Sequence, residues 1–456
     1  MSASTRDWKS KTRRFGELDF DSLNFELSTD RYHCQAYAER ERNAVWLQTW
    51  QVVGRVDELP KAGDWKEHRL FNQSYIIVRG ADGELRGFVN ACRHRGNKLC
   101  QGKGNSARFT CPYHLWSYGL DGRLVGVARP DLVGPIDKSK LGLLPVPVDC
   151  FAGFIFLNPD SNAMPLLDFI GADVAELLAP YRLEEMVPVG MDVKEALNCN
   201  WKVVMDAFSE GYHIIGVHPE LLSVTGVEAG ASRHGFYGDH RMVVRPFEVK
   251  NLDECSLEQQ VEGIRSLTAT FPSVREVLPL FEQSIASYRN GQGELLLPEG
   301  VTVRGILQQA TRASLTARGM DVSGLTDDQM SDNQAWYFFP NFFATIRAGE
   351  MTTILPMPHP SGDAGRCLWH VTAYKWLPEA ERAGQRAQLL EVQEPGSYPY
   401  FLALQQDYDQ MQRQQEGLSN LALKKVRLVR EEVNVARFHQ VLDGYMANAA
   451  GTTDVN

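Results

Sequence analysis

Two cysteines and two histidines lie close together in one segment, "CRHRGNKLCQGKGNSARFTCPYHLWSYGLDG", and they constrain the fold of this chain more than any other feature. Cys92 and His94 form a C-x-H pair, and sixteen residues later Cys111 and His114 form a C-x2-H pair. Each pair follows a short β-rich run, "GFVNA" or "ARFT". We therefore expect two hairpin loops that meet around one metal centre.

Two kinds of metal centre use two cysteines and two histidines. One is a tetrahedral zinc site, and the other is a Rieske [2Fe–2S] cluster, in which both histidines ligate the same iron. Zinc fingers usually hold their cysteines and their histidines in separate pairs, whereas each loop here provides one of each. This arrangement favours the cluster. Cys100 lies between the two pairs without a partner of its own, so we treat it as a spectator.

A second candidate site is the stretch "EGYHIIGVHP", which contains Glu210, His213 and His218. In a regular helix, five residues turn the chain about 140° past the first face, so the two histidines share an ion only if the helix loosens or ends. Gly216 and Pro219 predict such a break near Gly216. Taken alone, the stretch fits either a metal site or ordinary core and surface histidines.

The size and charge of the chain limit its class. Its 456 residues exceed one ordinary core, so we expect two or more structural units. The formal net charge of −10 argues against nucleic acid as a partner. The sequence has no apolar run typical of a membrane helix and no signal-peptide core at the N-terminus. Because the eight cysteines are scattered, we expect a reducing, cytoplasmic location and metal binding rather than disulfides.

Three segments differ in sequence texture. Residues 1–44 are polar with an amphipathic piece, which predicts a helical segment that packs on the largest domain. Residues 45–162 alternate β-rich runs with turn signals such as "ADGE", which predicts a small all-β domain. Residues 163–456 predict an α+β domain whose antiparallel sheet is flanked by helices. Within it, "ADVAELLAPYRLEEM", "WKVVMDAFSEGYHII" and residues 256–290 have helical periodicity.

The first motif, "CRHRG…CPYHLWSYGLDG", closely resembles the Rieske signature of the large (alpha) subunits of non-heme iron ring-hydroxylating oxygenases. The resemblance implies that Cys92 and Cys111 hold one iron of a [2Fe–2S] cluster and that His94 and His114 hold the other. It also implies that Trp116 packs on the cluster. Residues 45–162 would then be the Rieske domain, and residues 163–456 a catalytic domain of the helix-grip type with a mononuclear iron.

The same resemblance implies a second metal site, a facial triad of two histidines and one carboxylate that leaves positions open for dioxygen and substrate. The family motif acid-x2-His-x4-His matches this chain, so His213 and His218 are expected to bind Fe(II). The third ligand is expected to be Asp407, which lies eight residues before Gln415 at the usual offset of the family. Asp409 is the alternative.

Glu210 occupies the bridging position of this family. A carboxylate here is expected to accept hydrogen bonds from an iron-ligating histidine and from a cluster-ligating histidine of the neighbouring subunit, which orients both rings. The bridging acid is often Asp, whereas this chain has Glu. The dipeptide Asp206-Ala207 also departs from the acid-Asn of many members. A bridge across subunits implies a ring, most simply a homotrimer, with or without a small β subunit.

The implied function is that of the terminal oxygenase component of a Rieske system. Electrons from NAD(P)H would pass through a flavin reductase, a ferredoxin or both to the cluster and then to the Fe(II) that activates O2. The principal expectation is cis-dihydroxylation of a hydrophobic aromatic or other ring substrate. A Rieske monooxygenase or demethylase shares the same motifs. A non-enzymatic Rieske electron carrier or a zinc module is a further alternative, and it predicts no second iron.

The substrate pocket is expected between the iron ligands and the sheet, with residues 256–290 as a cover. An apolar cavity suits a ring compound, although aromatic strands are often plain core. Arg347 is a candidate partner of a substrate carboxylate, or else of a surface acid. The candidate lining residues are Phe208, Phe338, Phe339, Phe342, Phe343, Ile346, Met351 and Trp369.

Overall fold

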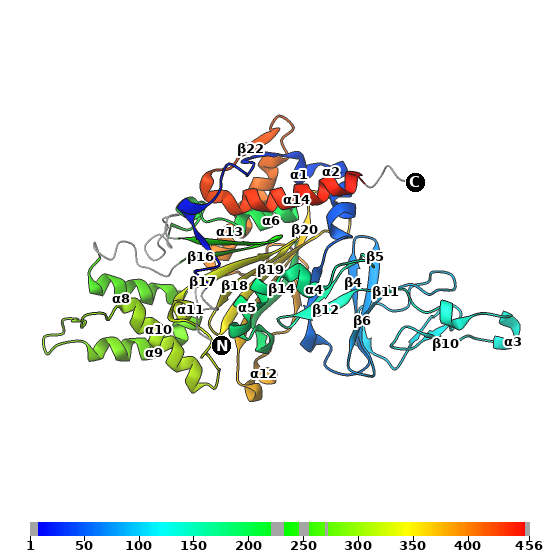
Figure 1. Cartoon of the computed structure of the whole chain (residues 1–456), viewed down its shortest axis with the longest axis horizontal. Coiled ribbons are helices and arrows are strands. Elements are labelled where there is room, and N and C mark those ends of the chain that lie inside the picture. Colours follow the sequence, from blue (N-terminus) through cyan, green and yellow to red (C-terminus); the bar gives the residue numbers. More distant parts are fainter. Residues whose placement is uncertain (1–7, 220–231, 246–254, 270–271, 452–456) are drawn as a thin grey trace. The chain divides into compact units, whose positions relative to one another are not determined.

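The computed structural model describes residues 8–219, 232–245, 255–269 and 272–451, which divide into two compact units (Figure 1). Unit 1 comprises the chain up to Tyr37 together with Ile170–Met357 and Ala364–Gly444. Unit 2 comprises Ala38–Phe169, Pro358–Asp363 and the chain from Tyr445. The divisions fall after Tyr37 and Phe169, whereas the sequence placed them after residues 44 and 162. The assignment of a function to each segment stays a prediction.

Unit 2 contains three antiparallel sheets, as expected for a small β domain. Their strand orders are β12-β13-β3, β11-β6-β5-β4-β7 and β10-β9-β8. The strands are β3 Gln51–Arg55, β4 Asp64–Leu70, β5 Gln73–Arg79, β6 Leu85–Val89, β7 Lys103–Asn105, β8 Phe109–Thr110, β9 Ser117–Tyr118, β10 Leu124–Gly126, β11 Pro145–Val146, β12 Val148–Phe151 and β13 Phe154–Leu157.

The core of unit 2 lies under the two predicted metal loops. Ile76 and Val78 of β5 and Phe88 of β6 are buried in one cluster with Cys92 and Cys111. The first loop follows β6, and the second joins β8 to β9. Both loops therefore leave a packed hairpin, which fixes the positions of their cysteines.

Unit 1 is built on a nine-stranded sheet with the order β1-β15-β16-β17-β18-β19-β20-β14-β21. The listed pairings are antiparallel except for β14 with β21, which is parallel. The strands are β1 Arg13–Arg14, β14 Met186–Leu197, β15 Arg233–Tyr237, β16 His240–Arg245, β17 Asn333–Phe338, β18 Phe342–Arg347, β19 Glu350–Pro358, β20 Cys367–Trp376 and β21 Leu390–Glu391.

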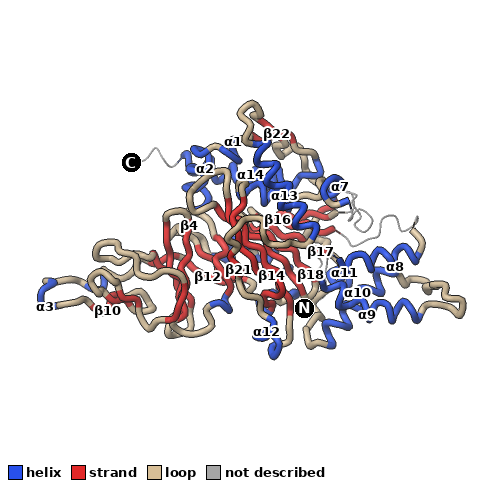
Figure 2. The backbone as a smooth tube through the Cα atoms, turned by 180° about the vertical axis from the view of Figure 1, so that it is seen from behind, coloured by secondary structure: helices blue, strands red, loops and turns tan. Residues whose placement is uncertain are grey.

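Helices pack on this sheet in two groups. α6 (Trp201–Phe208) contacts α13 (Leu402–Leu418) and β20, and α13 and α14 (Val433–Gly451) lie on the same side of the sheet in both views (Figures 1 and 2). The second group consists of α8 (Leu257–Ser266), α9 (Pro272–Ser287) and α10 (Val303–Ala317), which share a core of their own. The arrangement confirms the expected α+β fold.

The structure differs from the sequence-based expectations in several elements. The helix predicted over "ADVAELLAPYRLEEM" is only α5 (Ala172–Leu178), and β14 begins at Met186. The N-terminal segment contains β1 and the short strand β2 (Glu26–Ser28) besides its helices α1 (Asp30–His33) and α2 (Gln35–Glu41). These two strands form because β15 and β22 (Lys425–Arg427), both distant in sequence, offer partners.

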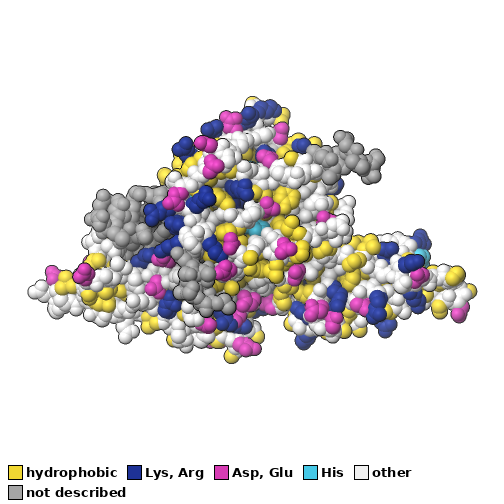
Figure 3. Space-filling view, viewed as in Figure 1, with side chains coloured by type: hydrophobic (Ala, Val, Ile, Leu, Met, Phe, Trp, Pro, Cys, Tyr) yellow, Lys and Arg dark blue, Asp and Glu magenta, His cyan; other side chains and the backbone are white. Residues whose placement is uncertain are grey.

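Charged side chains of both signs are interspersed over the face shown in Figure 3. None of the helices in the described part of the chain is both long and apolar enough to span a bilayer.

Candidate metal centres and active site

The two loops of unit 2 are closed by backbone hydrogen bonds that start at the predicted cysteine ligands. The N–H of Gly96 donates to the carbonyl oxygen of Cys92 (2.8 Å), and that of Leu115 donates to Cys111 (3.0 Å). Leu115 adopts a left-handed conformation (φ 58°), which lets the second loop turn tightly. Cys92 and Cys111 are buried. Each loop therefore holds its cysteine inside and its histidine nearer the surface.

The two predicted histidine ligands lie side by side. The ring centroids of His94 and His114 are 4.6 Å apart, and His94 stacks on Trp116 at 4.9 Å with nearly parallel planes. Trp116 is buried, so it supports the ring of His94 from the protein side. Desolvation, together with the positive charges of His94 and Arg95, lowers the pKa of His114. A neutral imidazole is the form that binds a metal.

The spacing of these four side chains favours a cluster over a single zinc ion. Zinc holds its ligand atoms about 2.0–2.3 Å from the metal, so all four would lie within about 4.8 Å of one another. Within the described residues, the only group of three or more ligand-type side chains that meets a 4.8 Å limit is a different one, in unit 1. In a Rieske cluster, the two cysteines bind one iron and the two histidines the other.

Tyr118 and Cys100 are the remaining polar groups near the loops. The hydroxyl of Tyr118 accepts a hydrogen bond from the N–H of Arg93 (2.9 Å) and lies 3.2 Å from the Sγ of Cys92. Burial raises the pKa of Tyr118, so its O–H proton remains available to the sulfur. Burial also raises the pKa of Cys100 to about 12, in keeping with a spectator thiol. The sequence analysis missed Tyr118, whose only signal was an aromatic residue at the end of the motif.

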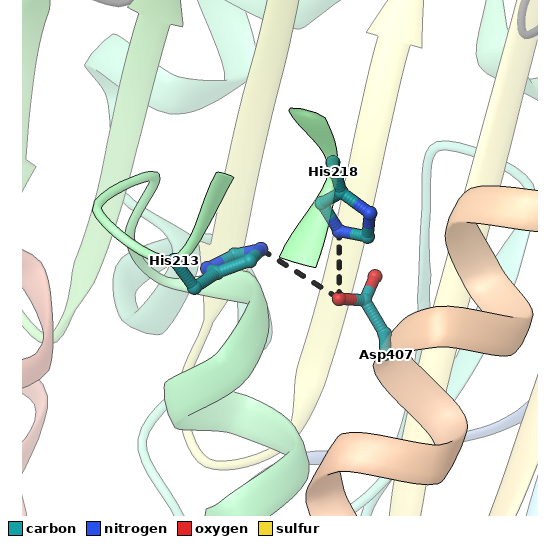
Figure 4. A group of neighbouring side chains, drawn as sticks. All are labelled: His213, His218 and Asp407. Carbon is teal, nitrogen blue, oxygen red and sulfur yellow. Dashed lines mark hydrogen bonds and ion pairs between the residues drawn. The ribbon is translucent and has the colours of Figure 1, made fainter. Parts of the chain in front are cut away.

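His213, His218 and Asp407 come together in unit 1, with ligand-type atoms that all lie within 4.8 Å of one another (Figure 4). The Nε2 of His218 is 2.9 Å from the Oδ1 of Asp407, and the Nε2 of His213 is 3.6 Å from the same oxygen. The side chains of His218 and Asp407 are buried, and that of His213 is 23% exposed.

A short helix, rather than a break at Gly216, brings the two histidines together. α6 ends at Phe208, and the hydroxyl of Ser209 donates back to the carbonyl oxygen of Met205 (2.6 Å). A turn follows, and α7 (Ile214–Val217) begins after His213 and ends before His218. The predicted continuous helix over this stretch was therefore wrong. The predicted break at Gly216 was also wrong, since Gly216 lies inside α7.

The hydrogen bonds at the outer ring nitrogens fix the orientation of both histidines. The Nδ1 of His213 lies 2.5 Å from a carboxylate oxygen of Glu210, and the Nδ1 of His218 lies 2.8 Å from the Oε1 of Gln406. An ionised carboxylate only accepts, so His213 carries its proton on Nδ1 and turns the lone pair of Nε2 toward Asp407. Converging lone pairs with supported outer nitrogens are the donor set of a cation site, and they fit Fe(II).

Asp409 lies away from this group. Its carboxylate accepts a hydrogen bond from the side chain of Gln405 (3.0 Å) on the exposed face of α13. Two residues on a helix differ by about 200° in direction. The arrangement therefore favours Asp407 as the third ligand. Gln406, which the sequence analysis did not single out, supports His218 because it lies next to Asp407.

Glu210 contacts the histidine turn twice within the chain. One carboxylate oxygen pairs with the ring of His213, and the other accepts from the backbone N–H of His213 (3.1 Å). Its bridge to a neighbouring subunit stays a prediction. Asp206 has a different role, because it accepts from the hydroxyl of Tyr32 (2.7 Å) and lies 3.2 Å from the ring of His439. Asp206 thus joins the N-terminal segment and α14 to α6.

A cavity of about 640 Å³ opens beside the triad, which contributes all three of its side chains to the wall. α9 lines the opposite part, so residues 256–290 take part as expected through this helix. Four of the predicted residues line the cavity: Phe208, Phe343, Met351 and Arg347. The others do not: Phe338, Phe339, Phe342, Ile346 and Trp369.

Strand alternation explains most of these errors. Along β18, Phe343 and Arg347 point into the cavity, so Phe342 and Ile346 point to the other face. Trp369 donates its indole N–H to the hydroxyl of Tyr400 (2.8 Å) in the core. Arg347 is buried and pairs with Glu350 (3.1 Å), so it is not a surface residue.

Two family models match the chain. Residues 181–448 match the ring hydroxylating alpha subunit (catalytic domain), and residues 49–136 match the Rieske [2Fe-2S] domain. The first match covers more than half of the chain. It includes the group of His213, His218 and Asp407, and the second includes both loops of unit 2.

Curated relatives share about a third of the residues in the aligned part. The oxygenase subunit of glycine betaine monooxygenase from Pseudomonas aeruginosa (strain UCBPP-PA14) is 35% identical over 201 residues, which are 44% of this chain and 46% of that protein. The carnitine monooxygenase oxygenase subunit of Escherichia coli K12 is 35% identical over 195 residues, 41% and 50% of the two chains. Biphenyl 2,3-dioxygenase subunit alpha of Rhodococcus jostii is 34% identical over 202 residues, 42% and 43%. The chain spans about half the length of the curated relatives it matches.

Solved structures share the fold over nearly the whole chain. The quaternary ammonium Rieske monooxygenase CntA, in complex with an inhibitor, has a TM-score of 0.64 at 18% identity and covers 94% of this chain and 97% of its own. Naphthalene 1,2-dioxygenase with bound indole has a TM-score of 0.63 at 18% identity and covers 98% of each chain. With both family models, these likenesses lead to one conclusion: the chain belongs to the family of ring-hydroxylating oxygenase alpha subunits with a Rieske [2Fe–2S] domain.

Proposed function

We propose that this chain is the oxygenase component of a Rieske monooxygenase, which hydroxylates or dealkylates an organic substrate. The observation that carries the proposal is the group of His213, His218 and Asp407 at the wall of a large cavity. A carrier that only transfers electrons needs neither this second donor set nor a cavity of about 640 Å³ beside it.

The roles of the side chains follow from their contacts. Bound Fe(II) supplies open coordination positions where O2 is activated next to the substrate. His213, His218 and Asp407 would hold the ion, while Glu210 and Gln406 keep the outer nitrogens of the rings protonated and fixed. Phe208, which lines the cavity, limits water near the reacting atoms.

The reaction needs two electrons from outside the chain. One oxygen atom of O2 enters a new C–O bond of the substrate, and the other leaves as water with two electrons and two protons. We propose that a reductase, with or without a ferredoxin, delivers these electrons to a [2Fe–2S] cluster on Cys92, His94, Cys111 and His114. We further propose a homotrimer in which Glu210 lies between His213 and a cluster histidine of the next subunit.

Monooxygenation is chosen over cis-dihydroxylation because glycine betaine and carnitine monooxygenases are among the relatives. The biphenyl 2,3-dioxygenase relative supports cis-dihydroxylation as a second candidate. Turnover with 18O2, a reductase system and a screen of substrates separates the two. One labelled oxygen per product molecule supports monooxygenation, whereas two support dihydroxylation.

Iron analysis tests the proposed enzyme against an electron carrier. The enzyme holds about three irons per chain, two in the cluster and one in the triad. About two irons, together with a cavity that binds no substrate, would make the chain a carrier. A zinc module would contain no iron and show no visible spectrum.

A further inference from the structure

Arg245, the last residue of β16, differs from the other basic side chains that line the cavity. Within the described residues, no hydrogen bond or ion pair to its guanidinium is found. The other basic side chains each have an oxygen partner: Arg318 and Lys375 contact Glu276, Arg347 contacts Glu350, and Arg275 donates to the carbonyl oxygen of Thr268. Arg245 thus brings a positive charge to the cavity wall with its hydrogen-bonding capacity unused.

The position of this guanidinium depends on Gly211. A Cβ at Gly211 would lie 2.6 Å from a terminal nitrogen of Arg245 and 2.7 Å from its Cζ. Gly211 follows Glu210 and begins the turn that leads to His213. The absence of a side chain at this one position therefore lets the cation lie directly beside the turn that carries a predicted iron ligand.

The carboxylates nearby do not neutralise Arg245. Glu210 is engaged by the ring and the backbone of His213. Burial raises the pKa of Glu431, and the attraction of Arg245 only opposes that shift without joining the two residues in an ion pair. Basic side chains also outnumber carboxylates in the cavity wall, and a bound Fe(II) would add further positive charge.

We propose that Arg245 binds an anionic group of the substrate, a carboxylate, and holds that end of the molecule on the iron side of the cavity. The inference rests on the proposed oxygenase function and adds a substrate class to it. The planar guanidinium presents paired donors that match a carboxylate, and such charge-assisted pairs are strong where water is partly excluded. The body of the substrate would extend toward the apolar wall formed by Val277, Leu315 and Met351.

Three probes with one body and different charges test the proposal: naphthalene-2-carboxylate, naphthalene-2-carboxamide and trimethyl(naphthalen-2-yl)ammonium. Their Kd values are measured anaerobically on the full-length, iron-loaded protein by calorimetry. We expect the carboxylate to bind about 10-fold or more tightly than the amide, in line with a hydrogen-bonded charge pair. Arg245→Gln should abolish that preference, and Arg275→Gln, the matched change elsewhere in the cavity, should retain it.

Gly211→Ala tests the same contact without removal of the charge. The clash falls on the far end of a flexible side chain, so Arg245 can move aside at little cost to folding. The variant should lose most of the carboxylate preference while its Tm and cluster spectrum stay unchanged. Gly216→Ala is the control in the same stretch, because a Cβ there meets no atom within 4 Å.

The outcomes separate this proposal from the proposed function. Equal or absent binding of the carboxylate by the wild-type protein, tighter binding of the ammonium probe, or an unchanged preference in both Arg245→Gln and Gly211→Ala overturns the role of Arg245. Oxygenation of a neutral substrate by such a protein would leave the proposed function standing. Conversely, a preference that depends on Arg245 in a protein without turnover keeps the anion site and refutes the oxygenase.

Discussion

The four predicted cluster ligands, Cys92, His94, Cys111 and His114, lie within one short stretch, whereas His218 and Asp407 are 189 residues apart. The two sites also differ in shape. The ligand atoms of the triad all lie within 4.8 Å of one another, as a single ion requires, and those of the loops do not form such a group. Local hairpins are enough to build the first site, but the second exists only where α7 meets α13.

The two sites also expose different parts. In the loops, the cysteines are buried and His94 is exposed, which leaves the histidine edge accessible to a redox partner. In the triad, the side chain of His218 is 4% exposed, and the open side faces the cavity. This contrast teaches that one site is arranged for electron entry and the other for substrate chemistry. Five predictions test it.

The largest effect is expected from Cys111→Ser. Loss of a buried thiolate ligand should remove the cluster, its visible spectrum and all turnover, and lower the iron content to about one per chain. Optical spectra and iron analysis measure these changes. Cys100→Ser is the matched control and should keep the full spectrum, because Cys100 is a protonated spectator. Loss of the spectrum in the control would redefine the ligand set.

Asp407→Ala should reverse the pattern. Turnover should fall more than about 100-fold, beyond the usual cost of losing a supporting group, while the cluster spectrum stays intact. The matched control is Asp409→Asn, which should keep wild-type activity because Asp409 contacts only Gln405 on the exposed face of α13. Steady-state kinetics with iron analysis decides between them. An inactive Asp409→Asn with an active Asp407→Ala would exchange the two assignments.

Glu210→Gln should lower turnover by about 10- to 100-fold, because a neutral amide orients the ring of His213 less firmly. Glu210→Asp, which retains the charge, should recover part of the activity. Rapid mixing of the reduced protein with O2 measures cluster oxidation. If Glu210 also bridges two subunits, the oxidation rate falls together with turnover, whereas a purely local role leaves that rate unchanged.

Gln406→Leu should have a smaller effect, about 10-fold in metal affinity, because His218 keeps its place in the core but loses the acceptor for its Nδ1 proton. Titration of the apoprotein with Fe(II) measures it. Gln405→Leu removes the neighbouring amide, whose contact is with Asp409, and should leave the affinity unchanged.

The smallest effect is expected from Tyr118→Phe in the loops. The variant loses the O–H near the Sγ of Cys92, so the reduction potential of the cluster should fall and about 1 kcal/mol of stability should be lost. Redox titration and thermal unfolding report the two changes. An unchanged potential would show that the hydroxyl serves only the backbone N–H of Arg93.

By itself, the sequence determined which residues are able to bind metal and which fold class they belong to. C-x-H and C-x2-H predict two ligand loops because both pairs are local to a hairpin, and alternating β-rich runs predict the sheets of unit 2. The sequence also indicated His213, His218 and Asp407 by their resemblance to a family motif. It misplaced the break in the helix, because the hydroxyl of Ser209 and the turn after it end α6 before His213.

Only the tertiary structure decided which side chains face the cavity and which support the ligands. A strand alternates its faces, so a one-residue difference puts Phe343 in the cavity and Phe342 outside it. Gln406 and Arg245 have no local sequence signal, since their roles depend on the approach of segments far apart in the chain. Hydrogen bonds and cavity walls are non-local contacts, and for that reason packing rather than pattern defines them.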